Sequence, residues 1–298
     1  MTQLTSPGAL PQQPATGMEG LALAVAGQAA AGEDLTGLYG FGGLHGGAVA
    51  ALLLAQMQPT VAPDFRPVEI TTHYLSPVTE PPAVRVEVLR EGVRTTQVRA
   101  IATVGDNPVA TAEAVFSRAQ TRPADSARAL PVLTPTLPSG ITAIDDSQPF
   151  AVPAEFMPLA RLLEIRPATP TLPFSGADEA ALCAWIRLLD PGHGPGSDRH
   201  PTRGPRIRPL ARLLILVDSL APSYAALLRG LTPVPTVRMT VHFSPEAHRD
   251  ASTGDDGWVL VRGNTGQAGA DRWLTESLDV WTSSGTHLAS ATQLRTVR

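Results

Sequence analysis

Two long apolar runs organise this chain, and each is followed by segments in which apolar and polar residues alternate. The first run covers residues 48–57 (AVAALLLAQM) and the second covers residues 209–221 (PLARLLILVDSLA). Leucine-rich stretches of this length are typical of helices, and Pro209 suits a first helical position. Pro59 and Pro222 follow the two runs, where proline disfavours a continuing helix. The pattern therefore predicts two helices, the second of them buried.

Each predicted helix precedes a series of short segments that favour β-strands. After the first helix they cover 68–75, 84–90, 95–104 and 109–117, and after the second they cover about 236–243, 258–262, 272–281 and 287–297. Turn sequences at 91–92 and 105–108 predict hairpins between the last three strands of the first series. Between the two series, the pattern predicts a short helix at 156–165 and a strand at 181–189.

The order of one helix and then four strands occurs twice, and parts of the two series match residue by residue. THYLSP at 72–77 corresponds to TVHFSP at 240–245, and VATAEAV at 109–115 corresponds to LASATQL at 288–294. A tandem duplication accounts for both matches. The predicted fold class is α+β, with an N-terminal domain at 18–118 and a C-terminal domain at 150–298. We expect residues 1–17 to form a flexible N-terminus and the Pro-, Thr- and Ser-rich residues 119–149 to form an extended linker.

One carboxylate, Asp218, lies inside the second apolar run. On a helix, its neighbours three and four positions away include Leu214, Ile215 and Ala221, so it faces apolar side chains. An unpaired charge in such a place costs on the order of several kcal/mol. Either a functional role or a structural role with satisfied hydrogen bonds accounts for Asp218, and this residue alone does not decide between them.

A comparison of the two series shows which polar residues are particular to the second. Gln293 falls opposite Ala114 of the first series, and alternation along the last strand points Gln293 toward the helix that carries Asp218. Thr236 falls opposite Val68. Simple alternation turns Thr236 to the other face of its strand, and a bulge at the strand start would reverse this. The asymmetry suggests that the second copy retains a site that the first copy has lost.

The composition narrows the range of functions. The chain has 298 residues, of which 43% are hydrophobic, and this share is ample for a globular core. Its formal net charge is −4. Its 23 basic residues are all Arg, so no Lys is present for a phosphate-binding loop or a Schiff base. The absence of a basic stripe argues against nucleic acid as a partner. A single Cys excludes an intramolecular disulfide and residues 21–31 are too few to span a bilayer, so we expect a soluble cytoplasmic protein without a membrane partner.

A glycine-rich segment, residues 40–47 (GFGGLHGG), partly matches a dinucleotide-binding fingerprint, but no parallel β-α-β pattern follows it. Close packing of the next helix explains these glycines better. The backbone amides of Gly43 and Leu44, expected at the helix start, are candidates to bind substrate by polarising a carbonyl group.

Three further observations limit the chemistry. His193, Asp198 and His200 could ligate a metal, but they lie among Gly and Pro residues typical of a solvated loop, so no metal site is predicted. Cys183 alternates within an apolar strand, as a core thiol does. No G-x-S-x-G sequence occurs, which disfavours a serine hydrolase.

The ordered motifs FGGLHGGAVAALLLAQM, THYLSPV, VEVLREG, VATAEAVF, PTVRMTVHFSP and SATQL, with the Asp-bearing helix, resemble the acyl-CoA thioesterase II family from residue 18 to the end of the chain. The resemblance implies a tandem (double) hot-dog fold, in which each half is a long helix wrapped by an antiparallel β-sheet. It also implies hydrolysis of acyl-CoA to free fatty acid and CoA. Carried over by position, the catalytic residues that activate one water molecule are Asp218, Thr236 and Gln293.

This interpretation makes Asp218 a general base or water orienter, with acyl-CoA as the substrate and no metal or redox cofactor. One alternative is a hot-dog hydratase or dehydratase, whose chemistry needs an Asp and a His together, and no His lies near Asp218 in the sequence. Another alternative is an acyl-CoA binding or sensing protein without activity. The sequence leaves open the acyl chain length and whether the chain forms a homo-oligomer.

Overall fold

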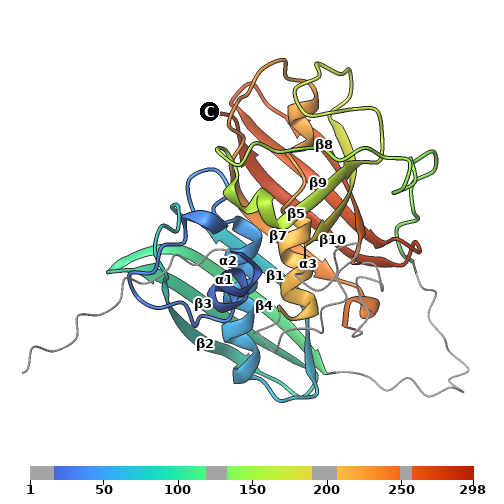
Figure 1. Cartoon of the computed structure of the whole chain (residues 1–298). Helices are drawn as coiled ribbons and strands as arrows, with labels where there is room; N and C mark the ends of the chain where they lie inside the picture. The colour runs from blue at the N-terminus through green and yellow to red at the C-terminus, as the bar shows by residue number, and fades with distance from the viewer. Residues whose placement is uncertain (1–16, 119–132, 190–206, 249–256) are drawn as a thin grey trace, which may run out of the picture.

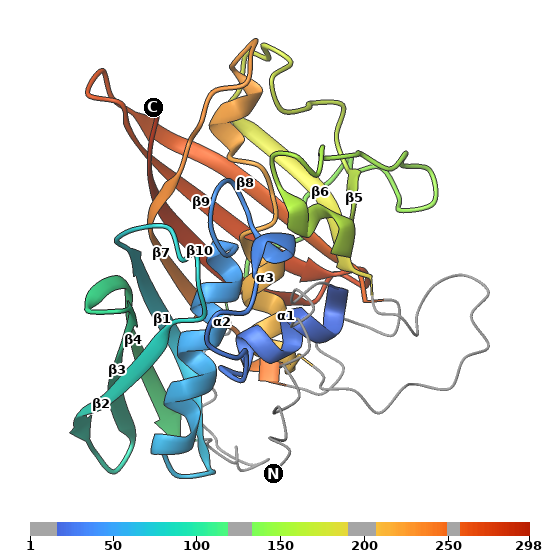
Figure 2. The ribbon, with the colours of Figure 1, turned by 60° about the vertical axis from the view of Figure 1, so that its left-hand side comes forward.

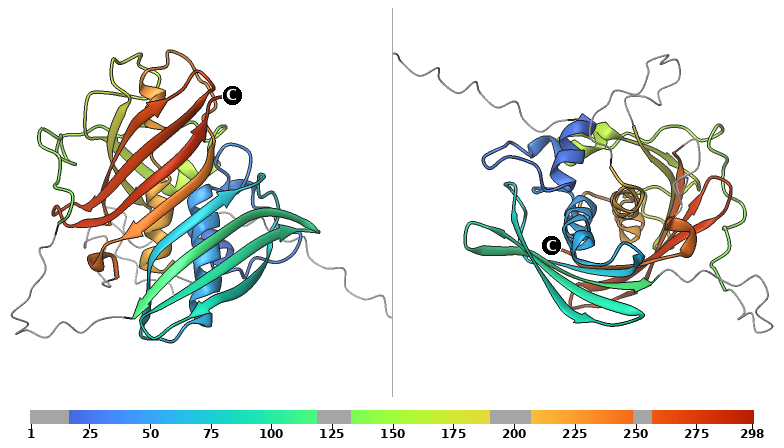
Figure 3. Two further views of the ribbon diagram at one scale, coloured as in Figure 1. Left: turned by 180° about the vertical axis from the view of Figure 1, so that it is seen from behind. Right: turned by 90° about the horizontal axis from the view of Figure 1, so that it is seen from below.

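Ten strands form one antiparallel sheet that curves around two central helices in the computed structural model of the protein (Figure 1). The structure describes residues 17–118, 133–189, 207–248 and 257–298, and the ten strands are those of these residues. A view from below shows the sheet bent around both helices (Figure 3).

The helices and strands have the following bounds. The α-helices are α1 (Gly17–Val25), α2 (Gly46–Met57) and α3 (Pro209–Val217), and two of the short 3-10 helices are η3 (Pro158–Leu162) and η4 (Ser223–Ala226). The strands are β1 (Phe65–Tyr74), β2 (Ala83–Glu91), β3 (Thr95–Val104), β4 (Asn107–Arg118), β5 (Leu163–Pro167), β6 (Ala181–Leu188), β7 (Thr236–Phe243), β8 (Val259–Ala268), β9 (Trp273–Thr282) and β10 (His287–Thr296). Their order across the sheet is β2-β3-β4-β1-β7-β10-β9-β8-β6-β5.

The two halves of the sheet have the same internal order. The order β2-β3-β4-β1 in the first half is mirrored by β7-β10-β9-β8 in the second, and β1 pairs with β7 where the halves meet. Thr71 and Thr240 are direct partners in this pairing, and their hydroxyl oxygens lie 2.9 Å apart in a hydrogen bond. The repeat predicted from the sequence and the predicted hairpins β2–β3 and β3–β4 are confirmed.

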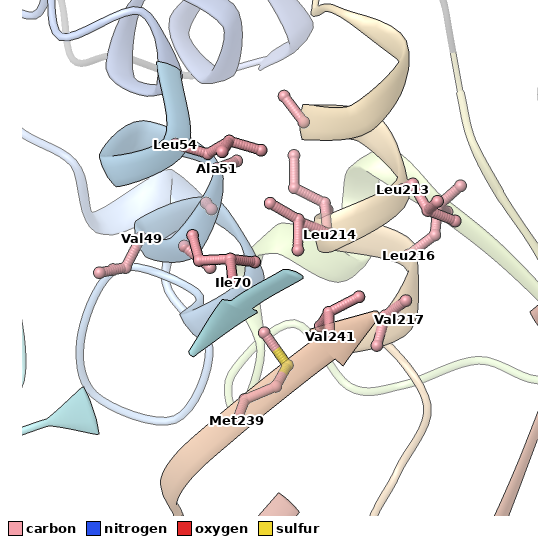
Figure 4. Packing of buried hydrophobic residues seen from close by; sticks show 14 of the residues in the cluster. Val49, Ala51, Leu54, Ile70, Leu213, Leu214, Leu216, Val217, Met239 and Val241 are labelled. Atoms are coloured by element: carbon pink, nitrogen blue, oxygen red, sulfur yellow. The ribbon is translucent and has the colours of Figure 1, made fainter. Parts of the chain in front are cut away.

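Helices α2 and α3 lie against each other inside the curve of the sheet, and α1 packs against α2 (Figure 2). A Cβ atom on Gly47 would lie 2.4 Å from the carbonyl oxygen of Leu214 and 2.7 Å from Ile215 Cα. The two helices approach this closely only because residue 47 is glycine. Figure 4 shows buried apolar side chains of both helices packed over Ile70 of β1 and Met239 of β7. Because the sheet, α3 and α1 surround α2, this helix has almost no solvent face, which explains its apolar sequence.

Helix α3 is shorter than the sequence predicts. It ends at Val217 rather than at Ala221, and Asp218 occupies its C-cap position with φ −91° and ψ 3°. The hydroxyl of Ser219 donates a hydrogen bond to the carbonyl of Ile215 (2.7 Å), which satisfies one of the last free carbonyls of the helix. The proline at position 222 disfavours helical backbone at the residue before it. Asp218 therefore lies at a helix end rather than inside a helix.

The segment at 156–165 also differs from the single short helix that the sequence predicts. It forms the 3-10 helix η3 and then enters β5. Strand β5 pairs with β6 from Leu163↔Leu188 to Pro167↔Ala184. The conformation of these residues is therefore decided by a neighbouring strand and not by the local pattern.

The described part of the linker, from residue 133 onwards, is extended but packed. The indole N–H groups of Trp185 and Trp281 donate hydrogen bonds to the carbonyls of Thr142 (2.8 Å) and Pro135 (3.0 Å). These bonds hold the linker on the outer face of the second half of the sheet. Cys183 lies buried in the same apolar cluster, and burial raises the pKa of its thiol to about 12, as expected of a core thiol.

Some of the sequence predictions fall on other parts of the chain. Residues 1–16 of the expected flexible N-terminus, and His193, Asp198 and His200, lie outside the described residues. No group of three His, Cys, Asp or Glu side chains within the described ranges is arranged to hold a metal ion. Across the same ranges, every helix is too short or too polar to cross a membrane.

The substitution Gly47→Ala tests the close approach of α2 and α3. The added methyl group meets backbone atoms of α3, and overpacking of this kind costs about 1–3 kcal/mol or more. In a thermal unfolding experiment we expect Tm to fall by roughly 3–10 °C. Gly230→Ala is the matched control, because a Cβ at residue 230 meets no atom within 4 Å, and it should leave Tm unchanged. Equal Tm values for the two variants would contradict the packing.

Candidate active site

Asp218 joins the end of α3 to the start of α2. Its Oδ2 accepts a hydrogen bond from the N–H of Gly47 (2.8 Å), and its Oδ1 accepts one from Nε2 of Gln293 (3.0 Å). The side chain is only 9% exposed. The C-terminal end of its own helix disfavours a carboxylate, whereas the N-terminal end of α2 favours one. The structure therefore brings together Asp218 and Gln293, and the start of α2 offsets the cost of burying the charge.

Gly46 leaves the space that this carboxylate occupies. A Cβ atom on Gly46 would lie 2.6 Å from Oδ2 of Asp218 and 3.3 Å from the ring of Tyr74. Tyr74, at the end of β1, donates a hydrogen bond from its hydroxyl to the carbonyl of Gly46 (3.0 Å). Burial and the charge of Asp218 raise the pKa of this hydroxyl well above its usual value, and Arg295 acts in the opposite direction. The Tyr74 side chain is therefore a neutral hydrogen-bond donor.

His45 is the N-cap residue of α2 and lies beside Asp218. Its Nε2 is 3.1 Å from the backbone carbonyl oxygen of Asp218 and 3.8 Å from Oδ2. Burial lowers the pKa of His45, and the charge and carbonyl of Asp218 oppose this only in part, so the neutral ring is favoured. The tautomer with hydrogen on Nε2 donates to the carbonyl of Asp218. It leaves the buried Nδ1 as an acceptor without a partner in the described part of the chain.

His45 gives no direct sign in the sequence of its place beside Asp218, because no histidine lies close to Asp218 along the chain. The two residues are 173 positions apart, and the packing of α2 on α3 brings them into contact. The sequence-based argument against a hydratase, that no His lies near Asp218, is therefore wrong, because His45 lies beside Asp218 in the folded protein. The available signal was the sequence His-Gly-Gly at the start of a buried helix.

Two further polar atoms on the inner face of the sheet are buried without a partner among the residues described. They are Oγ1 of Thr72 and Oε1 of Gln293. Thr72 pairs with Met239 of β7, and Met239 pairs with Gln293 of β10, so the three residues form one row across the sheet. Buried polar atoms in proteins are nearly always satisfied by protein or by water. These two atoms therefore mark a place for water or for a polar group of a substrate.

Thr236 lies on the face of the sheet that carries Gln293. In the pairing of β7 with β10, Thr236 is opposite Arg295, and Val237 is an extra residue that forms a bulge. The bulge reverses the simple alternation and turns Thr236 inward, because Arg295 shares the face of Gln293. No hydrogen bond links Thr236 to Asp218 or Gln293 in the part of the chain that is described.

The same bulge corrects the comparison of the two halves at this point. In β1 the extra residue is Val68, which lies between the paired residues Pro67 and Glu69. The two bulged residues, Val68 and Val237, are therefore equivalent. Thr236 corresponds to Pro67, so its match with Val68 in the sequence alignment is wrong by one residue.

Gly43 and Leu44 lie before α2 and not at its start. The helix begins at Gly46, and the N–H of Leu44 donates a hydrogen bond to the carbonyl of Val78 (2.8 Å). That amide is therefore already engaged. Among the amides at the start of the helix, the one that meets Asp218 is that of Gly47.

Asp218 and Gln293 belong to the second half, and the first half has no equivalent carboxylate and amide. Gln293 and Ala114 are equivalent, because each pairs with the residue two positions after a bulge, Met239 in one half and Ile70 in the other. Helix α2 carries no acidic residue. The reciprocal pair of helix ends therefore lacks the carboxylate of the Asp218–Gly47 contact.

Models of known families match both halves of the chain. The model of the acyl-CoA thioesterase N-terminal domain matches residues 37–117, and the model of the acyl-CoA thioesterase C-terminal domain matches residues 138–297. The chain belongs to the acyl-CoA thioesterase family. This membership makes it an acyl-CoA thioester hydrolase, as the sequence motifs imply. No curated protein matches this thioesterase.

Solved structures with the same fold cover most of the thioesterase. A hot-dog fold protein of unknown function from Alicyclobacillus acidocaldarius is 21% identical with a TM-score of 0.68, and the match covers 93% of this chain and 97% of that one. The tesB protein of Mycobacterium avium subs paratuberculosis is 18% identical with a TM-score of 0.60, over 86% and 88% of the two chains. Acyl-CoA thioesterase II TesB2 from Mycobacterium marinum is 17% identical with a TM-score of 0.58, over 86% and 90%. At these identities the likeness shows the fold.

The substitution His45→Gln tests the buried neutral histidine. Because the pKa of His45 is lower in the folded protein, the unfolded chain binds a proton first as the pH falls below about 6.5, and the free energy of unfolding decreases. Glutamine does not titrate and still offers a donor to the carbonyl of Asp218. We expect the fall in Tm between about pH 7.5 and 5.5 to be smaller in the variant than in the parent protein. The same fall in both proteins would show that His45 does not titrate in this way.

Proposed function

We propose that the thioesterase hydrolyses acyl-CoA to free fatty acid and CoA by means of a water molecule activated at Asp218. The observation that carries the proposal is the position of this carboxylate, which is held between the Gly47 amide and the Gln293 side chain at 2.8 and 3.0 Å. We also propose that the two halves, with their mirrored strand order, form a double hot-dog around this one site.

Gln293 has a free acceptor for the attacking water. Its Nε2 donates to Asp218, so its buried Oε1 is available to accept a hydrogen bond from water. Water held there lies next to a carboxylate that can take its proton, which is the arrangement that general-base catalysis needs. Thr236, on the same face of the sheet, is proposed as a further contact of this water.

The reaction proceeds by addition and elimination at the thioester carbon. Asp218 takes a proton as the water oxygen forms a bond to the acyl carbon, and the carbonyl oxygen becomes an oxyanion. Amides at or just before the start of α2, with the helix dipole behind them, stabilise that oxyanion; the Gly43 amide stays a candidate for this role, whereas the Leu44 amide donates to Val78. The C–S bond then breaks, the CoA thiolate takes up the proton held by Asp218, which restores the carboxylate, and the fatty acid leaves. No step uses a metal or a redox cofactor.

Release of free thiol from acyl-CoAs of increasing length, from acetyl to palmitoyl, measures both the activity and the preferred chain. We expect thiol release with at least one chain length. The absence of release across the whole series would contradict the proposal.

Substitutions at the site test the roles. Asp218→Asn keeps the shape and removes the base, so we expect kcat to fall by roughly 10²- to 10⁴-fold with little change in KM. Gln293→Ala and Thr236→Val should lose less, because Asp218 remains to take the proton. Ala114→Gln in the first copy should create no second site and add no activity. Near-parental turnover by Asp218→Asn would place the chemistry elsewhere, and a large fall in Tm with normal specific activity would make Asp218 structural.

Hydration of an enoyl-CoA is the second candidate function, because His45 and Asp218 lie together. A hydratase needs both side chains to reach the substrate, whereas Nε2 of His45 is engaged with the carbonyl of Asp218. We therefore expect no hydration. Loss of the enoyl absorbance without thiol release, abolished by His45→Gln, would overturn the thioesterase assignment of this site.

A further inference from the structure

A buried ion pair lies next to the site on the inner face of the second half. Nε of Arg295 donates a hydrogen bond to Oε2 of Glu276 at 2.6 Å, and the exposed fractions of the two side chains are 6% and 0%. Nη1 of Arg295 also donates to the carbonyl of Val234 (3.2 Å). The mechanism described above uses neither residue.

The pair is connected to both partners of the Asp218–Gln293 contact. Glu276 on β9 is the direct cross-strand partner of Gln293 on β10, and Arg295 lies two residues beyond Gln293 on the same face. The other carboxylate oxygen of Glu276 accepts the N–H of Ser223 (2.6 Å). Ser223 follows Asp218 by five residues, after the turn that ends α3. Glu276 therefore holds the turn that carries Asp218 against the strand that carries Gln293.

The fold itself does not require charged residues at these positions. The registers of the two halves make Val98 the equivalent of Glu276 and Phe116 the equivalent of Arg295, and both are fully buried. In the second half, glycine at position 263 leaves space for the Glu276 carboxylate, because a Cβ there would lie 2.9 Å from Oε1 of Glu276. A buried ion pair is generally no more stabilising than well-packed apolar residues of similar size. Stability alone thus gives no reason for this pair.

We infer that Glu276 and Arg295 are positioning residues that set the distance between Asp218 and Gln293 for catalysis. This inference rests on the proposed function of the same site. Glu276 fixes the turn after α3 through the amide of Ser223, and Arg295 fixes Glu276. A displacement of about 1 Å in a reacting group can lower a rate by about 10²-fold, so loss of the pair affects kcat more than KM.

Replacement by the first-half residues separates positioning from stability. The variants are Glu276→Val, Arg295→Phe and the double substitution E276V/R295F. Each single variant leaves one buried charge unpaired, so its Tm should fall strongly, whereas the double variant restores apolar packing and should recover most of the Tm. The kcat for thiol release should fall by roughly 10- to 100-fold in all three, with KM nearly unchanged. Recovery of Tm without recovery of kcat is the expected result.

A milder variant and a control complete the test. Glu276→Gln keeps an acceptor for the Ser223 amide and should retain more of the kcat than Glu276→Val. Arg99 and Glu113 form an exposed cross-strand pair on the outer face of the first half (2.7 Å), and Arg99→Gln with Glu113→Gln should leave kcat unchanged.

The outcomes separate the inference from the proposed function. If kcat recovers together with Tm in E276V/R295F, the pair is structural and the inference is wrong, while hydrolysis at Asp218 stands. If the parent protein releases no thiol, or Asp218→Asn keeps its turnover, the proposed function fails first. If the double variant keeps parental kcat and Tm, the pair positions nothing.

Discussion

The contact between the start of α2 and the end of α3 is the constraint on which the rest of the structure depends. Gly47 allows the two helices to meet backbone to backbone, and Gly46 leaves the volume that the Asp218 carboxylate fills. The amide of Gly47 then binds that carboxylate. A larger residue at position 47 meets the backbone of α3, and one at position 46 meets the Asp218 carboxylate. Packing and chemistry therefore depend on the same few atoms.

The two halves have the same strand order but different side chains on the inner face of the sheet. The strand order is mirrored about the β1–β7 junction, where the Thr71 and Thr240 hydroxyls meet. On the first inner face the relevant positions hold apolar side chains, which pack on α2. On the second they hold an amide and an ion pair, beside the end of the shorter helix α3. A polar site fits there because α3 stops early and leaves the sheet to be covered by a turn.

Burial also sets the protonation of the groups around the carboxylate. His45 is kept neutral by desolvation, and the Tyr74 hydroxyl keeps its proton because burial and the charge of Asp218 both raise its pKa. Asp218 thus has a neutral imidazole, a neutral phenol and two amide donors as its immediate neighbours. Under the proposed function the carboxylate takes the proton from water, while Nε2 of His45 and the Tyr74 hydroxyl are engaged as donors to backbone carbonyls.

The sequence by itself determined the repeat, the antiparallel strands and the Asp218–Gln293 pair, because periodicity and the comparison of two copies are local, one-dimensional information. It placed Asp218 inside a helix predicted to run to Ala221, whereas the helix ends at Val217, since hydrogen bonding at the helix end competes with propensity. Only the tertiary structure brought His45 to Asp218 and turned Thr236 inward through the bulge at Val237. Contacts between residues 173 positions apart follow from how two helices pack, and a bulge follows from the register of a neighbouring strand. Neither leaves a periodic signal in the chain.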